Sequence, residues 1–233
     1  MGTMVTVIYI AAALLPALFL MWYIYQKDKL EKEPGALLGR LFFSGVLAAL
    51  LALFLEQLFQ GVMDAFSYPS ESAYIITEAI MIGLSEEFAK YFFLYRNTWR
   101  SPEFNFRYDG IVYAVFVSLG FAAIENILYV FQYGIGIALS RGLLAVPAHM
   151  AFGVFMGSFY GRAKMAEIYG RTSDMKAQLA LAYVVPVALH AFYDACALLG
   201  SDTAMLLFVG FVIVMYIVVI RKVRMESRTD YQF

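Results

Sequence analysis

The sequence is poor in cysteine, histidine and charged residues. Its 233 residues include one cysteine, Cys196, which excludes an intrachain disulfide and a multi-cysteine metal site. Only two histidines are present, and charged residues are 15% of the chain, against about a quarter in average soluble domains. This shortage leaves little room for a separate soluble domain. No clustered basic patch points to a nucleic-acid partner.

Long apolar runs fill most of the chain. Hydrophobic residues make up 62% of it, and the mean hydropathy is +0.71. Because about 20 apolar residues cross a bilayer, seven runs are long enough to span: roughly 4–26, 41–63, 74–95, 110–132, 143–161, 178–199 and 204–220. No lysine or arginine precedes the first run, so we expect a retained helix and not a cleaved signal. The sequence predicts an all-α, polytopic membrane bundle of about seven transmembrane helices in a single domain, 1–233.

The basic residues indicate how the bundle lies in the membrane. Lysine and arginine concentrate in four segments, residues 27–40, 96–109, 162–177 and 221–233. The positive-inside rule places these segments in the cytoplasm. The N-terminus is therefore expected outside, and residues 221–233 form a short basic cytoplasmic tail. Of the basic residues, only Lys90 and Arg141 lie outside these four segments.

Ionisable residues also occur inside the apolar runs, where a charge costs about 3 kcal/mol at the bilayer centre. Six carboxylates and both histidines are placed this way: Glu56, Glu78, Glu86, Glu87, Glu125, Asp194, His149 and His190. A rise of about 1.5 Å per residue brings most of them into one layer near mid-bilayer. Glu78 is expected close to the outer interface, where it is solvated, and Glu56 is expected in a polar outer collar with Gln57 and Gln60. So many buried ionisable groups predict a functional site.

The third apolar run carries the densest cluster, Ser85-Glu86-Glu87-Phe88-Ala89-Lys90. Lys90 follows Glu86 by four residues and Glu87 by three, so on a helix both carboxylates can reach the ammonium. One ammonium compensates one carboxylate, and the second is then available as a base. We therefore expect the cluster to serve function beyond a structural ion pair.

The two histidines also lie in helical patterns that direct them into the bundle. His149 is followed at every fourth position by a glycine: Gly153, Gly157 and Gly161. Such a ladder of small residues allows a neighbouring helix to approach closely. His190 and Asp194 are four residues apart, so the carboxylate can hold the imidazole in one orientation.

These spaced elements resemble the PrsW family of intramembrane proteases and, more distantly, the CAAX prenyl-protease superfamily. The matching elements are Glu86-Glu87-x-x-Lys90, Phe121-x-x-x-Glu125-Asn126, the mid-span His149 and His190-x-x-x-Asp194. Two flanking segments, Lys32-Glu33-Pro34 and Tyr108-Asp109-Gly110, are also similar. The similarity extends from about Lys27 to the seventh run.

The resemblance implies an intramembrane endopeptidase of the bacterial cytoplasmic membrane. Such proteins make the first cut, at site 1, in a single-span membrane protein such as an anti-sigma factor. The CAAX relatives are described as glutamate proteases, whereas PrsW has often been classed as a metalloprotease. The resemblance thus leaves two mechanisms to compare.

In the glutamate mechanism, Glu86 takes a proton from water, Glu125 helps to orient that water, and His190 donates to the oxyanion or leaving group. Asp194 orients His190, while Glu87 and Lys90 set the local charge; which glutamate is the base stays open. In the metal mechanism, His149, His190 and a carboxylate (Glu86 or Glu125) hold Zn²⁺. The sequence has no H-E-x-x-H motif, so we favour no cofactor, with zinc as the alternative.

Two other classes of function also use buried ionisable groups. Chains of buried Glu, Asp and His form the proton relays of transporters and channels. Transporter folds usually contain internal repeats, and none is found in this sequence. A non-catalytic scaffold is disfavoured by the number of ionisable groups expected at mid-depth.

Overall fold

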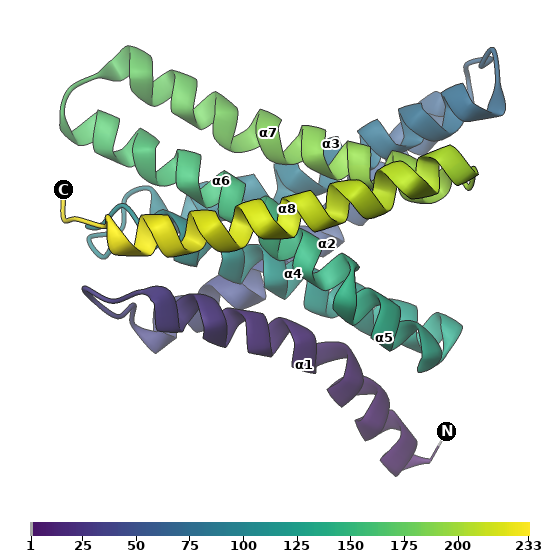
Figure 1. Ribbon diagram of the computed structural model, residues 1–233, viewed down its shortest axis with the longest axis horizontal. Helices are drawn as coiled ribbons and strands as arrows, with labels where there is room; N and C mark the ends of the chain where they lie inside the picture. The colour runs from purple at the N-terminus through teal and green to yellow at the C-terminus, as the bar shows by residue number, and fades with distance from the viewer. Residues whose placement is uncertain (1) are drawn as a thin grey trace.

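A computed structural model describes residues 2–233 as eight helices joined by short loops (Figure 1). The helices are α1 (Thr3–Lys27), α2 (Gly35–Met63), α3 (Glu71–Thr98), α4 (Asp109–Tyr133), α5 (Gly136–Leu143), α6 (Ala145–Ile168), α7 (Thr172–Leu198) and α8 (Asp202–Arg228). The predicted all-α membrane bundle is confirmed.

Seven helical segments have the length of a membrane crossing. Six segments of residues 2–233 are long and apolar enough to cross a membrane, with α5 and α6 together forming one of them. Helix α3 has 28 residues, so it is equally long. It falls short only in apolar character, because it carries the Glu86, Glu87 and Lys90 cluster and Glu78.

Several helix ends follow from local chemistry. The side chains of Ser70 and Ser201 accept hydrogen bonds from backbone N–H groups in the first turns of α3 and α8. Gly134 ends α4 with a φ of 85°, a conformation that only glycine adopts without strain. The last helix continues eight residues beyond the run predicted to end at 220, because its polar final turns remain helical. The fifth run is longer than predicted and is broken at Leu144 into α5 and α6.

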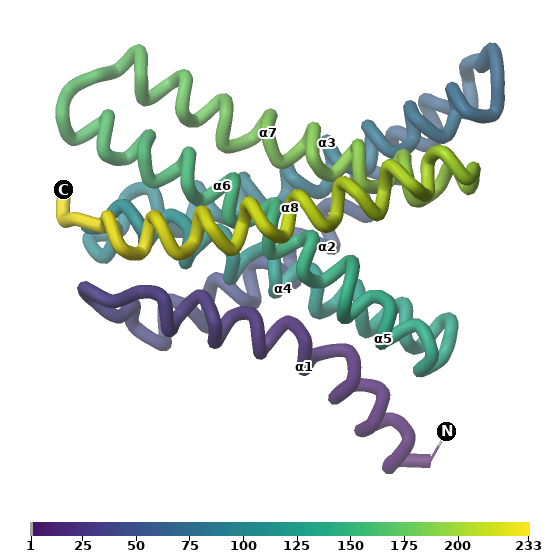
Figure 2. Tube along the Cα trace, viewed as in Figure 1, coloured from purple at the N-terminus to yellow at the C-terminus, as the bar shows by residue number. Residues whose placement is uncertain are grey.

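The loops alternate between two ends of the bundle (Figures 1 and 2). The loops 28–34, 99–108 and 169–171 lie at one end with the C-terminus, and we call this the basic end. The N-terminus and the loops 64–70 and 199–201 lie at the opposite, N-terminal end. This arrangement agrees with an odd number of crossings, and the positive-inside rule places the basic end in the cytoplasm.

Helix α4 is the centre of the bundle, and it packs against α1, α2 and α6. Glycines allow the closest approaches. A Cβ added at Gly157 of α6 would lie 2.3 Å from the Gly110 carbonyl oxygen, and one at Gly120 would lie 2.1 Å from the Phe42 oxygen. The predicted close packing beside His149 is therefore present, and it fixes α6 against α4.

Candidate functional site

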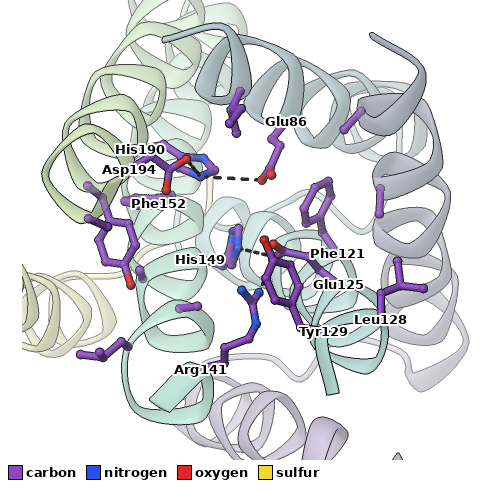
Figure 3. A pocket seen from close by; sticks show the side chains of 18 of the residues that line it. Glu86, Phe121, Glu125, Leu128, Tyr129, Arg141, His149, Phe152, His190 and Asp194 are labelled. Carbon is purple, nitrogen blue, oxygen red and sulfur yellow. Dashed lines mark hydrogen bonds and ion pairs between the residues drawn. The ribbon is translucent and has the colours of Figure 1, made fainter. Parts of the chain in front are cut away.

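Four helices bring the seven predicted site residues into one connected network, and Figure 3 shows the five of them that line a cavity: Glu86, Glu125, His149, His190 and Asp194. Helix α3 supplies Glu86, Glu87 and Lys90, α4 supplies Glu125, α6 supplies His149, and α7 supplies His190 and Asp194. Sequence spacing places each side chain on the inward face of its own helix. The packing of α3, α4, α6 and α7 against one another then brings these side chains together at one level of the bundle.

The Lys90 ammonium is the centre of the network. Its Nζ donates to Glu86 Oε2 at 3.0 Å and to Glu87 Oε1 at 2.8 Å, and it lies 3.0 Å from His149 Nδ1. The three partners match the three N–H groups of an ammonium. Lys90 is fully buried and also lies 4.0 Å from the ring centroid of Phe121. Each of the three N–H groups of the Lys90 ammonium therefore has a hydrogen-bond acceptor.

His149 connects this cation to Glu125. Its Nε2 lies 2.9 Å from Glu125 Oε2, and its Nδ1 faces the Lys90 ammonium. A lysine ammonium can only donate, so Nδ1 accepts and Nε2 carries the proton that Glu125 accepts. Both ring nitrogens of His149 are thus engaged in the neutral tautomer.

His190 faces carboxylates from both sides of its ring. Its Nδ1 lies 3.0 Å from Glu87 Oε1. Its Nε2 lies 3.3 Å from Asp194 Oδ2 and 3.8 Å from Glu86 Oε2. The Phe152 ring stacks on the imidazole at 4.8 Å between centroids and fixes its plane. With an acceptor at each nitrogen, this imidazole can donate from both positions.

The two adjacent glutamates, Glu86 and Glu87, have different surroundings in the structure. Glu87 is fully buried, and both Lys90 Nζ and His190 Nδ1 contact its Oε1 atom. Glu86 uses Oε2 for Lys90, and no partner for its Oε1 is found within residues 2–233. Glu86 lines a cavity, whereas Glu87 and Lys90 do not. Only Glu86 of this pair can touch a water molecule or a substrate that enters the cavity.

The cavity has a volume of about 540 Å³ and joins the site to one end of the bundle. Glu86, Glu125, His149, His190 and Asp194 lie along its wall. The lining continues to the ends of α4, α5 and α7 that lie at the N-terminal end: Gln132, Tyr133, Ser140 and Leu198. Access to the site therefore comes from the N-terminal end.

Two further ionisable residues line this cavity, and neither was predicted as part of the site. Arg141 of α5 places Nη2 2.9 Å from Glu125 Oε2, the same oxygen that His149 contacts. Its guanidinium also lies 3.8 Å from the ring centroid of Tyr129. Glu56 of α2 also lines the cavity. One signal pointed to Arg141, since it is the single basic residue of the loops predicted outside.

The arrangement does not fit a zinc ion. Ligand atoms of Glu86, Glu87 and His149 lie within 4.8 Å of one another, which is compact enough for a metal. These atoms converge on Lys90 Nζ, so the protein's own ammonium occupies the cation position. All four ring nitrogens of His149 and His190 face other side chains, whereas a zinc ligand needs a free nitrogen lone pair.

Comparisons with known proteins agree on one family. A family model described as PrsW family intramembrane metalloprotease matches residues 33–220. Protease PrsW of Halalkalibacterium halodurans is 37% identical over 221 residues, which cover 95% of this chain and 98% of the relative. Protease PrsW of Bacillus subtilis is 36% identical over 185 residues, covering 79% of this chain and 80% of the relative. No solved structure matches the chain.

Proposed function

The chain belongs to the PrsW family of intramembrane proteases and is a peptidase, and on this premise we propose that it cuts a membrane-anchored protein with a glutamate-activated water. The Glu86 carboxylate carries the proposal. One of its oxygens lies 3.0 Å from Lys90 Nζ, and the side chain lines the cavity. A carboxylate held through one oxygen can accept a proton from water through the other.

His190 supplies the acid in this proposal. As the water oxygen attacks the scissile carbonyl carbon, its proton passes to Glu86 and negative charge develops on the carbonyl oxygen. The His190 Nε2 lies 3.3 Å from Asp194 Oδ2 and 3.8 Å from Glu86 Oε2 at the cavity wall, where its N–H can be shared between Asp194 and that carbonyl oxygen. The proton on Glu86 or His190 then passes to the leaving amine as the C–N bond breaks.

Other side chains hold Glu125 and His190 in position. Arg141 and His149 both contact Glu125 Oε2, so Glu125 is held facing the cavity, where it can orient the water. Asp194 holds the His190 ring at Nε2, and Glu87 holds it at Nδ1. Glu87 and Lys90 lie behind the reacting atoms and set their charge and geometry.

We propose that this chemistry requires no metal, with a zinc-dependent protease as the alternative that the family's description names. The engaged ring nitrogens of both histidines support the metal-free form, as does Lys90 in the cation position. A zinc ion bound by His149, His190 and a glutamate requires these contacts to break.

The proposed substrate is a single-span protein of the bacterial cytoplasmic membrane, such as an anti-sigma factor cut at site 1. The cavity opens toward the N-terminal end, which the positive-inside rule places outside the cell. An outer opening agrees with a first cut on the outer side of the membrane. The relatives come from bacteria, which supports the proposed location in a bacterial membrane.

Replacement of Glu86 tests the proposal. The wild-type chain in liposomes is mixed with labelled single-span anti-sigma factors of the same bacterium, and cleavage is followed on gels. Glu86→Gln is expected to lower the rate by about 10²–10⁴-fold, the usual contribution of a general base. Glu71→Gln, at the exposed start of the same helix, is the matched control and keeps full activity. Full activity of folded Glu86→Gln contradicts the proposal.

A further inference from the structure

A second hollow of about 290 Å³ lies between α2 and α3. Three residues, Leu53, Glu56 and Ile82, line both this hollow and the active-site cavity. The two spaces are therefore neighbours, and Glu56 borders both. We call the second space the α2–α3 groove; it extends from Glu56 past Gln57, Gln60 and Glu78.

The groove face of α2 differs in chemistry from the face that looks outward. The outward face is apolar and exposed, at Leu47, Leu50, Phe54, Leu58 and Val62. The groove face carries Glu56, Gln57 and Gln60. Gln57 lies six residues before the end of α2, which is about 9 Å along the helix. Amide and carboxylate groups at this depth need hydrogen-bond partners that lipid does not provide.

The groove offers unused hydrogen-bonding groups. The Gln60 amide nitrogen donates to Asp64 Oδ1 at 2.8 Å and to Tyr74 Oη at 2.9 Å, which leaves its carbonyl oxygen as an acceptor. Within residues 2–233, the side chains of Glu56, Gln57 and Glu78 have no hydrogen bond or ion pair. Polar groups that line an open groove without protein partners are suited to a polar ligand.

A peptide cut inside a membrane presents such a ligand. A peptide bond within a helix is shielded by the helix itself, so the segment around the cut must unwind before water attacks it. Unwinding frees backbone N–H and C=O groups, which are costly to leave unpaired in a bilayer. We propose that the α2–α3 groove binds this unwound segment of the substrate, with Gln57, Gln60 and Glu78 pairing with its backbone. The inference rests on the proposed protease function.

Photocrosslinking tests the groove directly. A photoreactive phenylalanine analogue is placed at Gln57 or at the neighbouring, outward-facing Leu58, each in the Glu86→Gln background that slows turnover. The probe is the single-span anti-sigma factor whose cleavage by the wild-type chain has been established. We expect the adduct with this protein to form at position 57 and to be several times weaker at position 58.

Equal adducts at the two positions, or an adduct only at position 58, overturn the inference. Since wild-type cleavage is measured first, this result leaves the proposed protease function intact; absence of cleavage is a failure of that function instead. A kinetic measurement supports the crosslinking. Gln57→Leu is expected to raise KM roughly fivefold, the effect of one lost hydrogen bond of about 1 kcal/mol, with kcat little changed. An unchanged KM contradicts the binding role.

Discussion

At the scale of single residues, Lys90 explains how two adjacent glutamates coexist in a membrane helix. Its ammonium contacts Glu86, Glu87 and His149 and is shielded from solvent. Removing one member of a buried ion cluster leaves an uncompensated charge, which costs more than the cluster itself contributes. Lys90 is thus required for the fold as well as for the geometry of the site.

Lys90→Met is expected to destabilise the protein by about 3–5 kcal/mol, since it strands buried carboxylates. Equilibrium unfolding in detergent measures the loss. Adding Glu87→Gln removes the most buried carboxylate and is expected to restore part of the stability. Lys29→Met, in an exposed loop, is the control and should change little. Equal stability of Lys90→Met and wild type contradicts the ion cluster.

The sequence pointed to most residues of the candidate site because an ionisable side chain in an apolar run is conspicuous. Glu86, Glu125, His149 and His190 were proposed in this way, and the structure places them side by side. The roles of Glu86 and Glu87 could not be divided, because both are within helical reach of Lys90 and only packing against α7 buries Glu87. Arg141 was missed as a site residue, since it lies outside the apolar runs and is carried inward by α5. Glu56 was assigned to a polar collar, although it lines the cavity.

At the scale of helices, glycine contacts hold the site together. Gly157 of α6 lies against Gly110 and Ile111 of α4, and this close contact joins the two helices that carry His149 and Glu125. Spacing in the sequence predicted the glycine ladder. The partner helix could not be predicted, because any small-residue face could have filled that role.

Gly157→Ala is expected to destabilise the bundle by about 1–3 kcal/mol, the usual effect of overpacking a close contact. The added Cβ would lie 2.3 Å from the Gly110 oxygen. Gly39→Ala is the matched control, because its Cβ meets no atom within 4 Å in helix α2. Thermal unfolding of the two variants measures the difference. A Gly157→Ala protein as stable as Gly39→Ala rules out close α4–α6 packing.

The helix boundaries show what hydropathy can and cannot predict. Apolar runs marked the seven long helical segments, since bilayer thickness sets the length of a spanning helix. The runs did not mark where helices extend into polar sequence, as α8 does to Arg228. They also did not mark the break at Leu144, which separates α5 from α6 and lets Arg141 reach Glu125.

At the scale of the whole molecule, the basic end is closed while the N-terminal end opens into the cavity. The last residues pack on the loop 99–108: the Tyr108 N–H donates to Asp230 Oδ1 at 2.9 Å, and the Phe233 N–H donates to the Asn105 oxygen at 2.9 Å. Two acids of the loop 28–34, Asp28 and Glu33, are buried at this end. The lining of the active-site cavity therefore reaches the N-terminal end, whereas the packed loops and the C-terminal residues cover the basic end.

The buried loop acids predict how stability depends on pH. Burial raises the pKa of Glu33 to about 7 and the pKa of Asp28 to about 6. Between pH 4.5, which is the ordinary pKa of a glutamate, and about pH 7, Glu33 keeps its proton in the folded protein but loses it in the unfolded chain. The contribution of Glu33 to stability is therefore fully present below pH 4.5 and is lost as the pH rises through about 7.

Thermal unfolding between pH 4.5 and 8 checks this dependence. The midpoint is expected to fall with rising pH in the wild type, and Glu33→Gln is expected to flatten the slope and raise the midpoint at pH 8. Glu31→Gln, an exposed neighbour in the same loop, keeps the wild-type slope. A wild-type midpoint that rises through this range contradicts the burial of Glu33 as a neutral acid.

The central claim is that a glutamate-activated water, with Lys90 in the cation position, cuts the substrate without a metal. The most direct measurement determines bound metal and cleavage rate on one purified sample before and after treatment with a chelator. We predict far less than one metal ion per chain and an unchanged rate, with Glu86→Gln inactive in the same assay. One zinc ion per chain, whose removal abolishes cleavage and whose return restores it, would contradict the claim.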